Sequence, residues 1–244
     1  MNLSDAVFCV VDIESTGLNP ETDRIVESAC VATTAKEVLG MWASLVDGRP
    51  CNAETSAIHG LVDGDLDGAP EWVEARRRWG EFVDRIRSGN GGYIAAHNSA
   101  FDKSFVEPQG FDAWLCTKRL SGHLWPDAPS HKNQVLRYWR NLQVDTFGVL
   151  PHRALADCLV TAALLRDELS FMSADLDPKW LEIETDDQLV AFANSPITVT
   201  KWPFGKHFGN PISSAPASYV DWCLKLPDLD PDLRWTLENL AVRK

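Results

Sequence analysis

The sequence begins with an apolar run that ends in two closely spaced carboxylates. Val7–Val11 is rich in β-favouring residues and predicts a strand buried on both faces, with Asp12 and Glu14 directly after it. Side chains two residues apart in a strand point to the same face, so these carboxylates lie close together. Paired anions are costly to desolvate, and a hard divalent cation removes that cost. The spacing indicates a Mg²⁺ or Mn²⁺ site; the alternative is a strand end that emerges into solvent.

A third carboxylate follows a second buried strand. Tyr93–Ala96 predicts that strand, and Asp102 comes in the first turns of a helix expected over Ser99–Glu107. The positive end of a helix dipole favours an anion at this position. An aspartate that only starts a helix has the same signature, so Asp102 alone does not define a site.

A fourth carboxylate, Asp157, lies near the start of an apolar helix expected over Ala154–Ser170. Pro151 places His152 on a loop ahead of that helix. Because the unperturbed pKa of histidine is near neutrality, an imidazole beside a carboxylate-held metal suits a general base.

The elements that must position these residues begin with three strands. The strand at Val7 is followed by strands expected over Arg24–Ala32 and Val38–Val46, which predict an antiparallel start, and Pro50–Gly68 is expected to be mostly loop. A helix is expected over Glu71–Ser88, and strand and helix then alternate. This order predicts an α/β or α+β sheet with helices on its faces.

The length and composition are those of an ordinary globular protein, with 244 residues of which 45% are apolar and 24% charged. No apolar run is long enough for a membrane span and no signal sequence is recognised, so no membrane partner is expected. Six scattered cysteines without a CxxC pair predict a cytoplasmic protein without structural disulfide or zinc. The net charge of −12 argues against a purely electrostatic DNA binder, but not against an enzyme that reaches phosphates through cations.

Taken together, the motifs resemble those of DEDDh-type 3′→5′ exonucleases. Asp12-x-Glu14, His97-Asn98-x-x-Phe101-Asp102 and His152-x-Ala154-x-x-Asp157 match that family in order and spacing. Three further stretches extend the resemblance to about residues 5–170: Ser15–Leu18, Ile58–Leu61 and Cys116–Leu120.

The resemblance implies an α/β fold of the RNase H-like (DnaQ-like) kind, a mixed sheet flanked by helices. It implies that Asp12, Glu14, Asp102 and Asp157 hold two Mg²⁺ (or Mn²⁺) ions and that His152 is the general base. It also implies that Thr16 and Leu18 contact the terminal nucleotide, with Leu18 against the base. The predicted substrate-binding set is completed by Gly17, His59 and Asn98. A structural role for His59 and local hydrogen bonding for Asn98 remain alternatives.

Three segments are expected: an exonuclease domain at 1–172, an acidic linker at 173–200 with one helix near Asp187–Asn194, and a small module at 201–244. The module resembles one found behind the nuclease in exodeoxyribonuclease X-like proteins. Its cations could contact phosphates while its aromatic rings stack on bases, or the rings could form its own core. The residues concerned are Lys201, Lys206 and His207 with Trp202, Phe204 and Phe208.

These features predict a metal-dependent 3′→5′ exonuclease that hydrolyses DNA with a free 3′ end to nucleoside monophosphates. The alternatives are an exoribonuclease of the RNase T or oligoribonuclease type, a polymerase proofreading subunit, and a catalytically silent nucleic-acid-binding scaffold. The intact carboxylates and His152 argue against the scaffold, and a folded tail argues against the proofreading subunit. The oligomeric state is left open.

Overall fold

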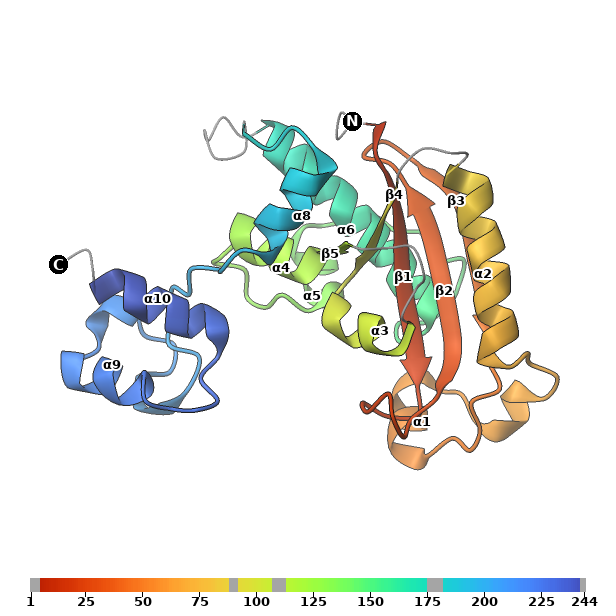
Figure 1. The fold of residues 1–244 in the computed structure, drawn as a ribbon, viewed down its shortest axis with the longest axis horizontal. Helices are drawn as coiled ribbons and strands as arrows, with labels where there is room; N and C mark the ends of the chain where they lie inside the picture. The colour runs from red at the N-terminus through yellow and green to blue at the C-terminus, as the bar shows by residue number, and fades with distance from the viewer. Residues whose placement is uncertain (1–4, 88–91, 107–112, 175–181, 242–244) are drawn as a thin grey trace.

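A five-stranded mixed sheet forms the centre of the protein. The computed structural model describes residues 5–87, 92–106, 113–174 and 182–241. The strand order is β3-β2-β1-β4-β5, with β1 in the middle (Figure 1). Strands β1 to β3 are antiparallel, whereas β4 runs parallel to β1 and β5 parallel to β4. The strands are β1 (Val7–Ser15), β2 (Ile25–Thr33), β3 (Val38–Leu45), β4 (Gly92–Ala96) and β5 (Trp114–Cys116). The predicted mixed sheet and its antiparallel start are confirmed.

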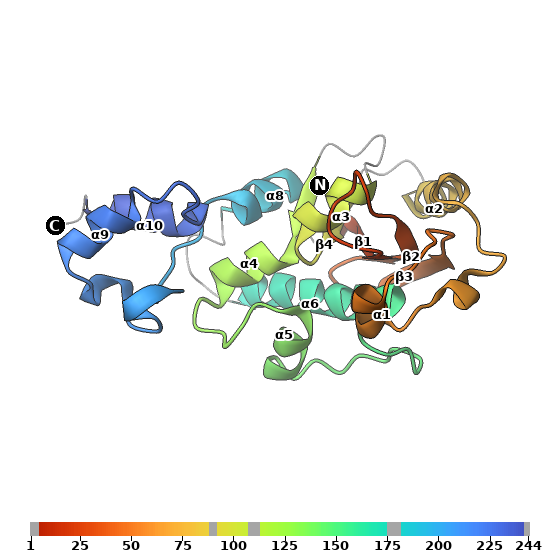
Figure 2. The same cartoon turned by 90° about the horizontal axis from the view of Figure 1, so that it is seen from below.

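Alternate residues of β1 build two separate cores, one on each face of the sheet. Phe8 and Val10 pack in the core that α6 covers, and Cys9 and Val11 pack in the core that α2 covers. Figure 2 shows α6 and α2 on opposite sides of the sheet. Because side chains alternate along a strand, Asp12 and Glu14 continue the α6 face of β1. The apolar run Val7–Val11 of β1 is therefore buried on both faces, as its composition predicts.

Helices cover both faces of the sheet, and the helices expected over 71–88, 99–107, 154–170 and 187–194 are among them. The helices of the nuclease part are α2 (Trp72–Arg87), α3 (Ser99–Val106), α4 (Thr117–Leu124), α5 (Asn133–Trp139), α6 (Ala154–Ala174) and α8 (Asp186–Asn194). The expected continuations of two helices to Ser88 and Glu107 lie outside the described residues. None of the helices in the described ranges combines the length and apolar character that crossing a membrane requires.

The stretch expected to be mostly loop contains two short helices, α1 (Ala53–His59) and η2 (Asp63–Leu66). Asn52 starts α1 because its side chain accepts a hydrogen bond from the Thr55 amide, and Gly60 ends it in the left-handed conformation. Leu61 and Leu66 pack with Val26 in a small core under β2. Neither α1 nor η2 was predicted, because both are short and have no apolar periodicity.

The tail folds around a core of its own. It contains η3 (Gly205–His207), η4 (Ile212–Ser214), α9 (Ala217–Cys223) and α10 (Pro231–Ala241). Trp202 is 1% exposed in that core, Phe204 packs against it, and Phe208 is 73% exposed. The alternative in which the aromatic residues form a core therefore applies to Trp202 and Phe204, but not to Phe208.

The boundaries of the three predicted segments stay a prediction. Within the expected linker 173–200, α8 packs through Leu189, Val190 and Ala193 into the core on the α6 face. Residues 175–181 of that linker lie outside the described residues.

Candidate active site

Three carboxylates meet where β1 ends and α6 begins. Asp12 and Glu14 lie on the α6 face of β1, and Asp157 lies in the first turn of α6, which packs on β1 and β2. One oxygen of each carboxylate lies within 4.8 Å of the others. Carboxylate oxygens at such separations can share a hard divalent cation. The structure thus brings together three of the four carboxylates that the motifs predict.

The fourth carboxylate, Asp102, comes from α3, and its charge is the largest that acts on Asp12. It lies in the first turn of α3 and is 2% exposed. Backbone hydrogen bonds from Asp102 itself and from Ile13, the residue between Asp12 and Glu14, hold one side of its carboxylate. Its Oδ1 is buried without a hydrogen-bond partner among the described residues. A buried oxygen of this kind is a free ligand atom at the edge of the carboxylate cluster.

Burial raises the pKa values of all four carboxyl groups, and the charges of neighbouring carboxylates raise those of Asp12 and Glu14 further. The pKa of Asp12 lies well above its usual range. Burial is the largest cause, and the charges of Asp102, Glu14 and Asp157 add to it. Burial and the charges of Asp157 and Glu27 raise the pKa of Glu14 to about 8, and burial raises that of Asp102 to about 7. Burial also raises the pKa of Asp157. A divalent cation would relieve this repulsion, so the donor set fits a metal centre.

The raised pKa of Glu14 predicts that the metal-free protein loses stability as the pH rises. Unfolded Glu14 ionises near 4.5, but the folded protein keeps it protonated up to about 8. The stability that it contributes is therefore complete below pH 4.5 and is lost as the pH approaches and passes 8. In EDTA, the melting temperature should fall between pH 5 and 8, by about 2–4 °C for each kcal/mol lost.

Thermal melts of the wild type and of Glu14→Gln, at both pH values with EDTA or Mg²⁺, check this prediction. Glu14→Gln should show a shallower decline, and Mg²⁺ should raise the wild-type melting temperature more at pH 8 than at pH 5. Equal pH slopes for the two proteins in EDTA would contradict the prediction.

Two hydrogen bonds fix the carboxylate of Asp157. Gln134 Nε2 donates to its Oδ1 at 2.7 Å, and the backbone N–H of His152 donates to its Oδ2 at 3.2 Å. His152 is exposed, has a φ of 61°, and precedes the first residue of α6 by two positions. His152 therefore lies on a loop beside the carboxylate cluster, as Pro151 predicts.

A fifth acidic residue, Glu27 of β2, was missed by the sequence reasoning. It lies opposite Glu14 in the β1–β2 register and is 6% exposed. Arg153 donates to both of its carboxylate oxygens, at 2.7 and 2.9 Å, and the Ala154 N–H donates to Oε2 at 3.0 Å. Glu27 therefore holds the N-terminus of α6, which carries Asp157, against the sheet. The signal in the sequence was a lone acid within an otherwise apolar strand.

Substituting Glu27 by glutamine should destabilise the protein by about 1–3 kcal/mol, because Arg153 loses its charged partner. Turnover should fall as well, because the start of α6 is no longer held in place. Urea unfolding together with the cleavage rate measures both effects, with Glu37→Gln, an exposed residue of the β2–β3 turn, as the matched control. A Glu27→Gln protein that behaves like Glu37→Gln would show that the pair does not position α6.

The turn after β1 contains the predicted nucleotide contacts. The Thr16 hydroxyl accepts a hydrogen bond from the Arg24 N–H at 2.9 Å, which ties the turn to the start of β2. A Cβ on Gly17 would lie 2.4 Å from a carboxylate oxygen of Asp23, so any larger residue would displace that carboxylate. Leu18 is 83% exposed. The turn therefore holds its backbone in place and projects an apolar side chain into solvent.

The two remaining predicted substrate-binding residues, His59 and Asn98, form hydrogen bonds within the protein. His59 is buried at the end of α1, its Nδ1 accepts from the Leu61 N–H at 3.0 Å, and burial lowers its pKa. Its Nε2 is buried without a partner among the described residues, and its predicted part in substrate binding stays a prediction. Asn98 has a φ of 78° just before α3, and its Oδ1 accepts from Lys118 Nζ at 3.3 Å.

Comparison with known proteins agrees with this geometry. The exonuclease family matches residues 9–165, which is more than half of the chain. The chain belongs to this family. It is 31% identical over 236 residues to exodeoxyribonuclease 10 of Escherichia coli (strain K12), covering 94% of this chain and 96% of that protein. It is also 30% identical over 173 residues to the PolC-type DNA polymerase III of Listeria welshimeri, covering 67% of this chain and 11% of the polymerase.

Solved structures show the same fold for this exonuclease. Exonuclease X in complex with 5′ overhanging duplex DNA matches with a TM-score of 0.58 and 28% identity, over 77% of this chain and 99% of that one. The nuclease domain of 3′hExo bound to rAMP matches with a TM-score of 0.57 and 15% identity, over 67% of this chain and 92% of that one. The predicted DEDDh resemblance, the RNase H-like fold and the enzyme class, a 3′→5′ exonuclease, are confirmed. The carboxylate cluster fits the divalent-metal dependence of this family.

Proposed function

We propose that this exonuclease hydrolyses DNA from its 3′ end and releases nucleoside monophosphates. The observation that carries the proposal is the convergence of Asp12, Glu14 and Asp157 within 4.8 Å, with the buried, unpartnered Oδ1 of Asp102 near enough for its charge to act on Asp12. DNA is preferred as the substrate because of the similarity to E. coli exodeoxyribonuclease 10, which extends over 94% of the chain and therefore includes the module.

The four carboxylates would hold two Mg²⁺ or Mn²⁺ ions. When bound, such a pair stabilises the attacking and leaving oxygens of an in-line displacement at phosphorus and activates water near neutral pH. Gln134 and the His152 N–H keep the Asp157 carboxylate in one orientation. The pair of Glu27 and Arg153 keeps the start of α6 on the sheet.

The side chains on the loops supply the remaining roles. His152 is the general base that takes the proton of the attacking water, because it is exposed and its backbone is fixed beside Asp157. The exposed Leu18 would contact the base of the terminal nucleotide, with Thr16 and Gly17 shaping the turn. Asn98 would lie beside the strand that enters the site. A cytoplasmic location stays a prediction from the use of cysteine.

One time course tests the proposed function. End-labelled single-stranded DNA, duplex DNA and RNA of the same sequence are incubated with the protein and Mg²⁺, Mn²⁺ or EDTA. We expect successive loss of single nucleotides from the 3′ end of DNA with either metal and intact DNA in EDTA. Products that shorten from the 5′ end, cleavage in EDTA, or faster loss of RNA than DNA would overturn the proposal.

A further inference from the structure

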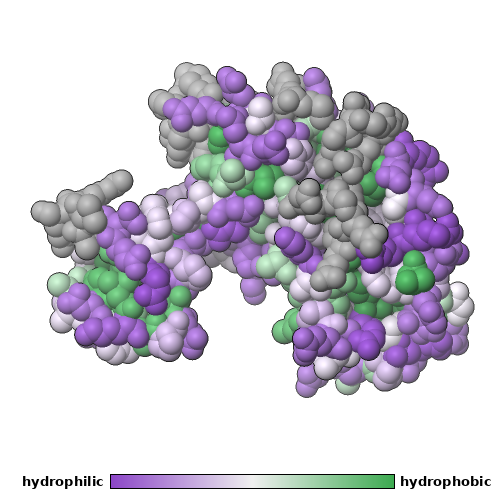
Figure 3. Space-filling model, viewed as in Figure 1, coloured by the Kyte–Doolittle hydropathy of each residue, from purple (hydrophilic) through white to green (hydrophobic). Residues whose placement is uncertain are grey.

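A large groove separates the nuclease from the C-terminal module. Its volume is about 1000 Å³, and both parts of the chain line it. Figure 3 shows a hollow between the two parts on this face of the molecule. The segment Ile197–Trp202 runs along it and leads into the module. The groove is therefore a shared feature of the two parts, and neither part forms it alone.

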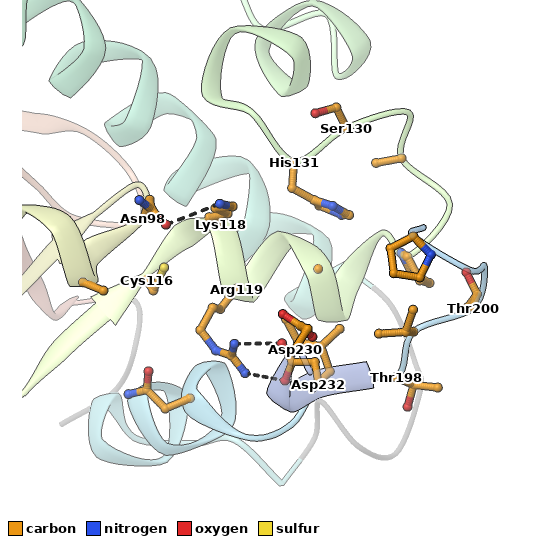
Figure 4. Close-up of a pocket in the computed structure, with 18 of the residues that line it drawn as sticks. Asn98, Cys116, Lys118, Arg119, Ser130, His131, Thr198, Thr200, Asp230 and Asp232 are labelled. Carbon is orange, nitrogen blue, oxygen red and sulfur yellow. Dashed lines mark hydrogen bonds and ion pairs between the residues drawn. The ribbon is translucent and has the colours of Figure 1, made fainter. Parts of the chain in front are cut away.

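The nuclease end of the groove is lined by the start of α3, the helix that carries Asp102. Asn98 and Ser99 line it, and Asp102 lies one helical turn further along α3 with its side chain directed to β1. Lys118 of α4 also lines this end and donates to the Asn98 side chain (Figure 4). A strand whose 3′ end lies among the carboxylates can therefore leave the site through the groove.

The side chains of the groove suit a nucleic-acid strand. Lys103, Lys118 and Lys201 line it and are exposed, and none of them forms an ion pair within the part of the chain that the structure describes. Phe208 of the module also lines the groove and is 73% exposed. Unpaired cations contact phosphates, and an exposed ring offers a face on which a base can stack.

Two of the three acidic residues that line the groove, Asp230 and Asp232, hold the module, and the third, Asp127, is exposed. Arg119 of α4 donates to both carboxylate oxygens of Asp232 in α10, at 2.9 and 3.1 Å (Figure 4). The same carboxylate accepts from the Ile197 N–H at 3.0 Å, and Asp230 accepts from the Leu233 N–H at 2.9 Å. In a protein with a net charge of −12, this leaves a local surface where the unpaired lysines are in excess.

We propose that this groove binds the single-stranded part of the DNA that leads 5′ from the nucleotide being removed. Lys118 and Lys201 contact its phosphates, and Phe208 stacks on one of its bases. The module thus extends the substrate site and does not take part in the chemistry. This inference rests on the proposed function, because the polarity of the strand follows from a 3′ end at the carboxylates.

Binding of a fluorescein-labelled 20-nucleotide oligo(dT), measured by anisotropy in EDTA, tests the groove. The variants are Lys118→Ala/Lys201→Ala and Phe208→Ala in the full chain. The matched control is Lys36→Ala/Lys225→Ala, which removes the same charge outside the groove. The double groove variant should bind roughly tenfold more weakly at low salt, with a salt dependence shallower by about 1.4 logarithmic units per decade. Phe208→Ala should bind about five- to a hundredfold more weakly, the range of one lost stacking contact.

Groove variants that bind like the control would overturn the proposal, and so would a control that weakens as much as the double groove variant. The cleavage time course of the wild type, which tests the proposed function, is evaluated separately. If the wild type leaves DNA intact with Mg²⁺ and Mn²⁺ while the groove variants still lose affinity, the proposed function fails and the strand-binding groove stands.

Discussion

Asp12→Asn is expected to lower DNA cleavage by roughly a thousandfold, because charge stabilisation by a metal site supplies several kcal/mol and each 1.36 kcal/mol is a factor of ten. Asp12 lies on the central strand, and its pKa is raised by burial and by Asp102, Glu14 and Asp157. Removing one charge from this cluster relieves repulsion, so the fold should be as stable as the wild type or more stable. The cleavage rate at saturating Mg²⁺ and a thermal melt in EDTA measure both effects.

Asp84→Asn is the matched control, because it removes the same charge from an exposed position of α2. Its cleavage rate should equal that of the wild type. Activity of Asp12→Asn above a few per cent of wild type would show that Asp12 is not a ligand of the metal centre. A large loss of stability would instead give Asp12 a structural role.

Replacing His152 is expected to slow turnover by about a hundredfold or more, the usual contribution of a general base. His152→Asn is the cleaner substitution, because asparagine tolerates the φ of 61° better than alanine does. The backbone N–H that donates to Asp157 is retained in either variant. Metal affinity should hardly change, because hard cations prefer oxygen ligands.

Single-turnover cleavage and calorimetric titration with Mn²⁺ separate the two roles of His152. A slow rate with unchanged metal affinity supports the general base. Metal binding that collapses with the substitution would make His152 a ligand, and a normal rate would remove it from the mechanism.

The parts of the site that depend on local sequence could be predicted. Asp12 and Glu14 are two residues apart on an apolar strand, so their shared face follows from the period of the strand alone. His152 was placed on a loop because of its neighbour Pro151. In both cases the decisive information lies within a few residues.

The contacts that hold the site together could not be predicted, because their partners are far apart in the chain. Glu27 and Arg153 are separated by 126 positions, and Gln134 and Asp157 by 23. The apolar strand around Glu27 marks it as unusual, but nothing local identifies Arg153 as its partner. In the module, Trp202 and Phe208 have similar neighbours in the sequence, yet one is buried and the other exposed. Only the packing of α9 and α10 determines which ring stays exposed and can contact a ligand.

The dispersal of the carboxylates along the chain has a consequence during synthesis. More than half of the chain separates Asp12 from Asp157, and the start of α6 is held to the sheet through Glu27 and Arg153. A nascent chain that has only just emerged with β1 to β5 carries no complete set of ligands. If the four carboxylates are the metal ligands, as proposed, cleavage begins only when α6 has been translated and has docked, and unfinished chains do not cut the nucleic acids around them.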